Sequence, residues 1–254
     1  MNDETSAWFA EGMIARCHEA ATRAKAGGGR VVGIMCEYTP REIVMAAGAL
    51  PVCLCGGSAR MIPAAEEHLP ANLCPLIKST FGYSLNEANP FLAMADLLVA
   101  ETTCDGKKKM YELLAERHPM HVLELPQKPD DPGACARWTD ELRKLLRELE
   151  RRFGVTIGDA HLRDAICLMN RERRLRRRLA GLMQADRPPL GGRELLDLRS
   201  LISCLPADLA ACERLLDELP RRPPERRPPA GGARLLLTGV PAPHGAERVV
   251  ELIE

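Results

Sequence analysis

Short apolar runs and helical segments alternate through the first half of the chain. Four runs are apolar on both faces, which is typical of strands buried in a parallel sheet; they cover Arg30–Met35, Leu50–Leu54, Leu97–Ala100 and His121–Leu125. Helical spacing is found around them, over Ser6–Lys25, Arg41–Gly48 and Lys107–Arg117. The alternation predicts an α/β fold: a parallel sheet with flanking helices.

The second half of the chain has a different pattern. Leucines at 142, 145, 146 and 149 form one helical stripe. Two long helices are expected after it, over Asp159–Gln184 and Arg193–Leu219. Pro220–Gly232, with the sequence PRRPPERRPPAGG, predicts an extended linker.

A further strand is expected at Arg234–Thr238 and the opening of a helix at Ala246–Glu254. One strand and two turns of helix cannot bury a core by themselves. The 254 residues therefore divide, in this prediction, into an α/β domain of Rossmann or flavodoxin-like type (1–134), an all-helical segment (135–219), the proline-rich linker (220–232) and the first βα unit of a truncated second α/β domain (233–254).

Charge and apolar runs narrow the function classes. Lys plus Arg and Asp plus Glu are both 35, so the formal net charge is zero, which argues against nucleic-acid and anionic-membrane binding. The N-terminus has no signal-peptide pattern and no run approaches a membrane span, so we expect a cytoplasmic protein. The run RERRLRRR (Arg171–Arg178) predicts a solvated helix face rather than an RNA site, because no aromatic residues interleave with it.

Ten cysteines are many for a cytoplasmic chain, where disulfides are rare and thiols serve metal or redox chemistry. Cys36 follows the first predicted strand, Cys104 follows the third, and Cys74 precedes a proline in NLCPLIKSTFG. In open parallel sheets, ligands bind outside the carboxyl ends of the strands. We expect Cys36 and Cys104 on that edge, with Cys74 brought there by its loop.

Three thiolates without a histidine pair do not make a closed four-ligand zinc site, but they suit an iron–sulfur cubane in which another group holds one iron. The spacing matches no compact C-x₂-C pattern, so small buried hydrophobes remain the alternative interpretation. The histidines have no i, i+4 pairing, and no histidine metal site is proposed.

The motifs CEYTPREIVMAAGALPVCLCGG, NLCPLIKSTFGY and ADLLVAETTCDGKKKMYELL resemble the 2-hydroxyacyl-CoA dehydratase/benzoyl-CoA reductase superfamily. Within it they are most similar to the double-cubane-cluster proteins. The resemblance is close over about Arg30 to Leu125, and RLLLTGVPAPHGAERVVELIE is similar to the start of the family's second α/β domain.

The resemblance implies an iron–sulfur cluster held between two similar α/β domains, 4Fe–4S or the double-cubane 8Fe–9S type. By motif, Cys36, Cys74 and Cys104 are the ligands of the first domain. A separate ATP-hydrolysing activator would deliver low-potential electrons, and this chain has no phosphate-loop motif of its own. The expected function is reduction of a small molecule by an oxidoreductase that is a homodimer or heterodimer when complete.

Two alternatives stay open. One is a subunit of an (R)-2-hydroxyacyl-CoA dehydratase or of a benzoyl-CoA reductase-like enzyme, although the sequence shows no recognisable CoA pocket. The other is a non-catalytic fragment, since the second domain's ligands are missing and no cysteine follows Cys212.

Other residues near the motifs carry secondary hypotheses. Cys55 is a marginal fourth ligand, for which a buried strand thiol is the alternative. Glu37, Tyr38 and Lys78 flank ligand cysteines and are candidate proton carriers, each with a structural role as the alternative. The remaining six cysteines are expected in packing or incidental positions.

Overall fold

The computed structural model describes residues 3–128, 130–199, 204–229, 231, 233–238 and 247–254, with side chains from residue 12 onward except at 199. The chain forms two compact units, residues 18–167 and residues 1–17 with 168–254. The domain boundaries expected from the sequence stay a prediction.

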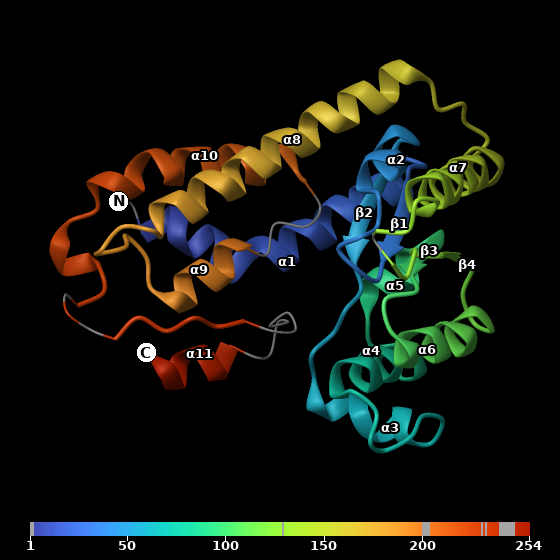
Figure 1. The fold of residues 1–254 in the computed structure, drawn as a ribbon, viewed down its shortest axis with the longest axis horizontal. Helices are drawn as coiled ribbons and strands as arrows, with labels where there is room; N and C mark the ends of the chain where they lie inside the picture. Colours follow the sequence, from blue (N-terminus) through green and yellow to red (C-terminus); the bar gives the residue numbers. More distant parts are fainter. Residues whose placement is uncertain (1–2, 129, 200–203, 230, 232, 239–246) are drawn as a thin grey trace. The chain divides into compact units, whose positions relative to one another are not determined.

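The first unit contains a sheet of four parallel strands in the order β2-β1-β3-β4 (Figure 1). The strands are β1 (Arg30–Ile34), β2 (Ala49–Cys53), β3 (Leu97–Glu101) and β4 (Met120–Leu123). In register, Ile34 lies opposite Cys53 on one side and Val99 on the other. The predicted parallel sheet is confirmed, with strand ends within two residues of those expected.

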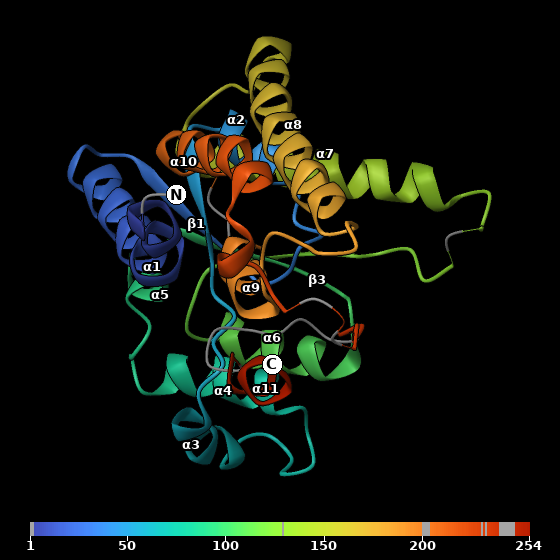
Figure 2. The ribbon, with the colours of Figure 1, turned by 90° about the vertical axis from the view of Figure 1, so that its left-hand side faces the viewer.

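Helices cover both faces of this sheet. Helices α2 and α7 lie on one face, and α4 and α6 lie on the other (Figures 1 and 2). The helical elements of residues 1–167 are α1 (Asp3–Ala26), α2 (Arg41–Ala46), η1 (Ala59–Met61), α3 (Ile62–Glu66), α4 (Pro75–Leu85), α5 (Pro90–Met94), α6 (Asp105–Ala115), α7 (Ala134–Phe153) and the start of α8 (Asp159–Leu182).

The strands form because their apolar side chains are buried on both faces. Residues 97–101 of β3 are all buried, and Val31, Val32 and Ile34 of β1 are at most 2% exposed. Burial of each such side chain stabilises the fold by about 1.5–3 kcal/mol. Gly33 leaves the space that Leu54 and Leu98 fill, since a Cβ there would collide with both.

The second unit is helical, with α9 (Gly192–Arg199), α10 (Pro206–Glu218) and α11 (Glu247–Ile253) beside the later part of α8. Helices α8 and α10 lie side by side in both views (Figures 1 and 2). Arg171 of α8 makes a two-point ion pair with Glu213 of α10, through Nε at 2.7 Å and Nη2 at 2.6 Å, and Arg178 pairs with Asp217. The arginine run therefore joins two helices as well as facing solvent.

One long helix over Arg193–Leu219 was expected, and the structure corrects this. Helix α9 ends at Arg199 and α10 begins at Pro206, while residues 200–203 lie outside the described part of the chain. Cys204 has a left-handed backbone, with φ of 53°. Proline has no N–H for an interior helical hydrogen bond but is favoured in a first turn, so Pro206 starts a new helix.

The proline-rich segment differs from the extended linker expected of it. It contains two short 3₁₀ turns, η2 (Leu219–Arg221) and η3 (Pro224–Arg226). The Arg222 guanidinium bonds to Glu194 at 2.6 Å, and Arg227 Nε donates to the Arg222 carbonyl at 2.8 Å. These bonds turn the segment back on its own unit. Residues 230 and 232 lie outside the described residues.

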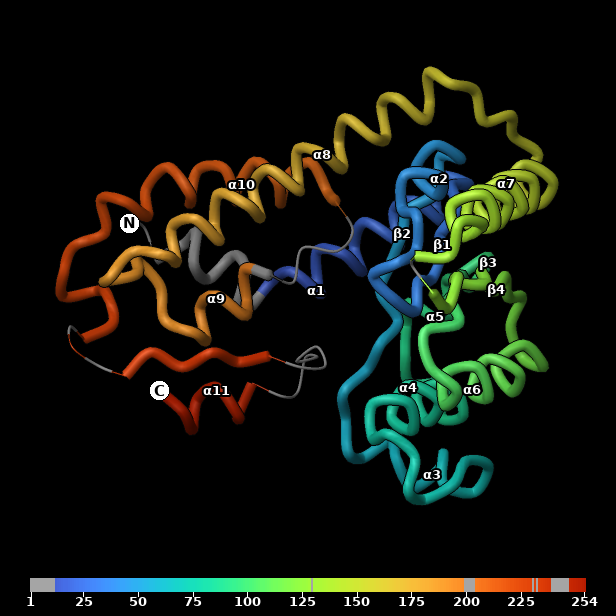
Figure 3. The backbone as a smooth tube through the Cα atoms, viewed as in Figure 1, coloured from blue at the N-terminus to red at the C-terminus, as the bar shows by residue number. Residues whose placement is uncertain are grey.

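The strand expected at Arg234–Thr238 is absent from the described structure. Residues 233–238 run as an extended trace without a sheet partner (Figure 3), and Leu236 is 87% exposed. A strand exists only when it pairs, so the apolar run alone was insufficient. The helix opening is present as α11, while residue 246 and the predicted turn before it, which includes His244, lie outside the described residues.

Candidate metal centre at the carboxyl edge of the sheet

Cys36 and Cys104 lie on either side of the position at which the strand order of the sheet reverses. The chain goes from β1 outward to β2 and then returns to the other side of β1 with β3. Cys36 follows β1 and Cys104 follows β3, so both leave the carboxyl ends of neighbouring strands. This is the place where open α/β sheets bind their ligands.

Two of the three predicted ligands also stand at helix N-termini. Cys74 is the N-cap residue of α4 and Cys104 that of α6. The Cys104 Sγ atom accepts a hydrogen bond from the Lys107 backbone N–H at 3.4 Å. Both thiols are exposed, whereas Cys36 is half-buried. Helix N-termini favour negative charge, which suits thiolates.

Close packing joins the Cys74 and Cys104 segments. Gly106 lies in the first turn of α6, and a Cβ there would be 2.8 Å from Leu73 Cδ1 and 2.9 Å from Ile77 Cδ1. Leu73 directly precedes Cys74. The missing side chain at Gly106 therefore lets the start of α4 approach the start of α6.

Lys107, the first of the three lysines that open α6, contacts the turn that carries Cys36. Its Nζ atom crosses to the Met35 carbonyl at 3.1 Å, next to Cys36. The following lysines pair within α6, Lys108 with Asp105 and Lys109 with Glu112. One cation of the run thus faces the thiols, and its charge acts on Cys53, Cys55 and Glu101.

Cys53 and Cys55 form a pair of half-buried thiols beside Cys36. The Cys55 Sγ atom donates to the Met35 carbonyl at 3.1 Å. The hydrogen bond between the two thiols lowers the pKa of Cys53 to about 7 and raises the pKa of Cys55. Cys55 is thus near the predicted ligands, and Cys53 is the thiol of this pair that ionises first.

Glu101, at the end of β3, is a buried charge that the sequence reasoning missed. Its side chain has no exposed surface, and it accepts a hydrogen bond from the Thr39 hydroxyl. Burial raises the pKa of Glu101 to about 7, although the Thr39 hydrogen bond, the Lys107 charge and Cys36 lower it. The signal was the charged residue that closes the apolar run LLVAE.

Tyr111 of α6 shows which groups share this region. Burial raises the pKa of its phenol well above the ordinary value, and the charges of four neighbours raise it further: Glu101, Cys55, Cys36 and Cys104. The Tyr111 hydroxyl and Glu101 Oε2 are buried without a hydrogen-bond partner in the described part of the chain. Cys36 and Cys104 therefore lie around the same buried groups.

The three predicted ligands are not brought into one coordination sphere. Among the described residues, no group of three or more cysteine, histidine, aspartate or glutamate side chains converges closely enough to hold a metal ion. Cys74 is linked to the Cys104 segment through the packing of Leu73 and Ile77 against Gly106. Thiols at a sheet edge, amide donors and a lysine nonetheless fit the chemistry of an anionic iron–sulfur cluster.

The candidate proton carriers divide by exposure. Glu37 and Tyr38 are exposed on the turn after Cys36, Tyr38 at 63%. Lys78 is buried, and its ammonium donates to Glu66 and to the Ala71 carbonyl, both at 2.6 Å. These two bonds attach Lys78 to the loop that leads to Cys74 and stabilise that loop.

The remaining six cysteines occupy varied positions. Cys204 and Cys212 are buried, and burial raises the pKa of Cys212 to about 11. Cys17 and Cys53 are half-buried, whereas Cys135 and Cys167 are exposed on α7 and α8.

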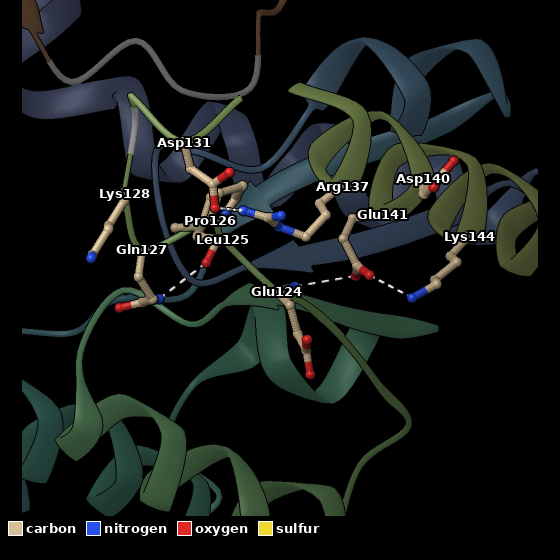
Figure 4. Close-up of a pocket in the computed structure, with 10 residues that line it drawn as sticks. All are labelled: Glu124, Leu125, Pro126, Gln127, Lys128, Asp131, Arg137, Asp140, Glu141 and Lys144. Atoms are coloured by element: carbon tan, nitrogen blue, oxygen red, sulfur yellow. Dashed lines mark hydrogen bonds and ion pairs between the residues drawn. The ribbon is translucent and has the colours of Figure 1, made fainter. Parts of the chain in front are cut away.

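A cavity of about 660 Å³ opens at the carboxyl end of β4 (Figure 4). Its walls are the segment after β4 and the first turns of α7, and most of its polar groups are charged. Arg137 pairs with Asp131, and Lys144 pairs with Glu141 at 2.6 Å. The lining carries four carboxylates and three cations, so the cavity shows no surplus of positive charge for a phosphate group.

Comparisons with known proteins place the chain in a family. The family model of the 2-hydroxyglutaryl-CoA dehydratase D-component matches residues 36–254. The Escherichia coli K12 protein YjiM, whose name describes it as a candidate dehydratase subunit, is 43% identical over 88% of this chain and 59% of its own length. The lactoyl-CoA dehydratase beta subunit of Anaerotignum propionicum is 29% identical over 61% of this chain and 40% of its own. A benzoyl-CoA reductase subunit of Thauera aromatica is 28% identical over 62% of this chain and 41% of its own.

The chain thus spans 40–59% of the length of these relatives. None of the helices in the described residues is long and apolar enough to cross a membrane. The family model covers most of the chain, including all three cysteine motifs and the helical unit from residue 168 onward. The chain belongs to the 2-hydroxyglutaryl-CoA dehydratase D-component family.

Proposed function

We propose that this chain is an iron–sulfur subunit of the double-cubane type, with Cys36, Cys74 and Cys104 as cluster ligands. The observation that carries the proposal is the position of Cys36 and Cys104 at the carboxyl ends of neighbouring strands, where the sheet reverses. Cys74 stands at the adjacent helix N-terminus. When bound, the cluster supplies one-electron transfer at low potential.

The chain's own groups would hold the ligands in a polar, positive setting. The Lys107 backbone N–H donates a hydrogen bond to Cys104 Sγ. The Lys107 ammonium donates to the carbonyl of Met35, the residue that precedes Cys36. Amide and ammonium groups beside the sulfurs offset the negative charge of a cluster and raise its reduction potential. Glu37 and Tyr38 are exposed close to Cys36 and are the proposed proton carriers.

Electrons would come from a separate ATP-hydrolysing activator, and a small molecule would be reduced in the cytoplasm. The names of the relatives describe them as subunits, which supports an assembly of several chains, a homodimer or heterodimer among them. Two of these relatives are named for lactoyl-CoA and benzoyl-CoA. Those names favour the second candidate function, a dehydratase or reductase subunit that acts on an acyl-CoA thioester.

The test is cluster assembly on the 254-residue chain. The protein is reconstituted anaerobically with iron and sulfide, and iron, acid-labile sulfide and the electron paramagnetic resonance spectrum are measured. We expect about four irons per chain, because the three cysteines of this chain would hold one of the two cubanes. Cys36→Ser, Cys74→Ser and Cys104→Ser should each lose most of the iron. Cys135→Ser, at an exposed thiol on α7, is the matched control and should retain it.

Absence of iron from the wild type, or equal loss in Cys135→Ser, would contradict the proposal and favour the non-catalytic fragment. The two candidate substrates are separated by adding acetylene or an acyl-CoA thioester to the loaded chain. Titanium(III) citrate replaces the activator as the electron donor. Reduction of acetylene supports the double-cubane function, and conversion of the thioester supports the second candidate.

A further inference from the structure

A buried side-chain hydrogen bond connects the turn that carries Cys36 to the strand that leads to Cys104. The Thr39 hydroxyl donates to Oε1 of Glu101. Both side chains are buried, Thr39 at 4% and Glu101 at 0% exposure. The bond therefore lies beneath the sheet edge rather than on the surface.

Each partner of this bond is fixed to one ligand segment. The Thr39 backbone N–H donates to the Cys36 carbonyl at 3.3 Å and closes the turn that begins at Cys36. Glu101 is the last residue of β3, three residues before Cys104. The Thr39–Glu101 bond thus sets the position of the Cys36 turn relative to the Cys104 segment.

A carboxylate is a costly choice for such a position. A carboxyl group without exposed surface loses its hydration, and here Oε2 has no hydrogen-bond partner in the described part of the chain. An apolar side chain of similar size would continue the buried pattern of β3 at lower cost. Glu101 does what an apolar side chain would not: it accepts a bond from the turn of the neighbouring strand.

We propose that Glu101 is a positioning residue which, through Thr39, holds the Cys36 turn against the end of β3 so that Cys36 and Cys104 face one ligand. The identity of that ligand rests on the proposed function. The relative position of the two thiols does not, and it can be measured in the metal-free chain.

The first experiment measures thiol proximity without metal. Dibromobimane becomes fluorescent when two thiols have each displaced one bromide, so it reports pairs of neighbouring cysteines. In a Cys53→Ser/Cys55→Ser background, we expect cross-linking of Cys36 to Cys104, identified by peptide mass spectrometry. Thr39→Val should lower the yield about five-fold, the change expected from the loss of one net hydrogen bond. Thr39→Ser, which keeps the hydroxyl, should restore it.

A matched control separates positioning from general loss of stability. Ser84 is another buried hydroxyl of the same unit, and among the described residues it makes no hydrogen bond to a cysteine. Its Oγ atom is hydrogen-bonded to His118 Nε2 at 3.0 Å. Ser84→Ala removes a comparable hydrogen bond and should leave the cross-linking yield unchanged. If Thr39→Val and Ser84→Ala lower the yield equally, the proposal is wrong.

The second experiment measures iron after anaerobic reconstitution. Glu101→Gln keeps an acceptor oxygen for Thr39 and should retain most of the iron, whereas Glu101→Ala should lose it. Equal iron in Glu101→Ala and wild type, or equal loss in both Glu101 variants, would overturn the positioning role. If the wild type binds no iron, the proposed function fails and the cross-linking experiment alone decides the role of Glu101.

Discussion

The Sγ atom of Cys104 accepts a hydrogen bond from the backbone N–H of Lys107, so a thiol occupies the N-cap position of α6. Serine is a better N-cap than cysteine because its oxygen is the stronger acceptor. We therefore expect Cys104→Ser to unfold in urea at the same or a higher concentration than the wild type while losing its iron. Cys104→Ala should lose the iron and also about 0.5–2 kcal/mol of stability.

These two variants separate a ligand from a structural cap. If the role of Cys104 were only to cap α6, Cys104→Ser would keep the wild-type iron content. Retained iron in Cys104→Ser would therefore remove Cys104 from the ligand set.

Gly106 tests the approach of α4 to α6. Gly106→Ala adds a methyl group within 3 Å of Leu73 and Ile77, and overpacking of this kind costs about 1–3 kcal/mol. We expect lower stability and less iron, because the segment that carries Cys74 is displaced. Leu73→Ala in the same chain removes one of these two close contacts and should recover part of the iron. No recovery in the double variant would mean that the approach at Gly106 does not position Cys74.

Asp96 gives the α/β unit an acid-sensitive anchor. Its carboxylate accepts hydrogen bonds from Lys25 Nζ and from the Val31 backbone N–H, both at 2.8 Å. Burial raises the pKa of Asp96. The two hydrogen bonds and the charges of Lys25 and Arg30 lower the pKa by more than burial raises it, so the pKa of Asp96 lies below its ordinary value of 3.8. A lowered carboxyl pKa stabilises the fold above the ordinary value, and this stabilisation is lost as the pH falls through the lower, folded-state value.

Asp96→Asn should therefore be less stable than the wild type at pH 6 by about 1.5–3 kcal/mol, the range for hydrogen bonds to charged groups. The difference should shrink toward pH 3, as measured by urea unfolding at both pH values. Asp130→Asn, at an exposed turn position, is the control and should follow the wild type. A difference that stays constant with pH would contradict the assignment of the acid dependence to Asp96.

The ion pair between Arg171 and Glu213 is testable by exchange of charges. Arg171→Glu places two carboxylates together and Glu213→Arg places two guanidinium groups together, so each single change should cost up to about 1 kcal/mol. The double exchange should restore most of the loss at low salt and less at high salt. Strictly additive losses in thermal unfolding would show that the two side chains do not interact in solution.

Much of the fold was predictable because parallel strands are buried on both faces and read as continuous apolar runs. The helices between β2 and β3 were not. Helix α4 buries Ser79, Thr80 and Ser84 together with Ile77 and Phe81, so its apolar residues show no helical period. The break before Pro206 was predictable from the proline, whereas the absent strand at Arg234–Thr238 depends on a pairing partner that local sequence does not specify.

The position of the site at one edge of the sheet was predictable, whereas the arrangement of its side chains was not. Apolar runs that precede Cys36 and Cys104 indicate two strand ends on one side of a sheet, and the strand order agrees. The approach of Cys74 depends on Leu73 packing over Gly106, which is tertiary. The Thr39–Glu101 bond joins residues 62 positions apart, and no local pattern announces it.

The exposed leucines of residues 235–237 affect how the purified chain behaves at high concentration. Three consecutive apolar side chains, 58–87% exposed, lie on an extended backbone that has no sheet partner among the described residues. Such a segment is a template for strand addition between molecules. We therefore expect this short stretch to limit the concentration at which the chain stays monodisperse, and Leu236→Lys to raise that limit.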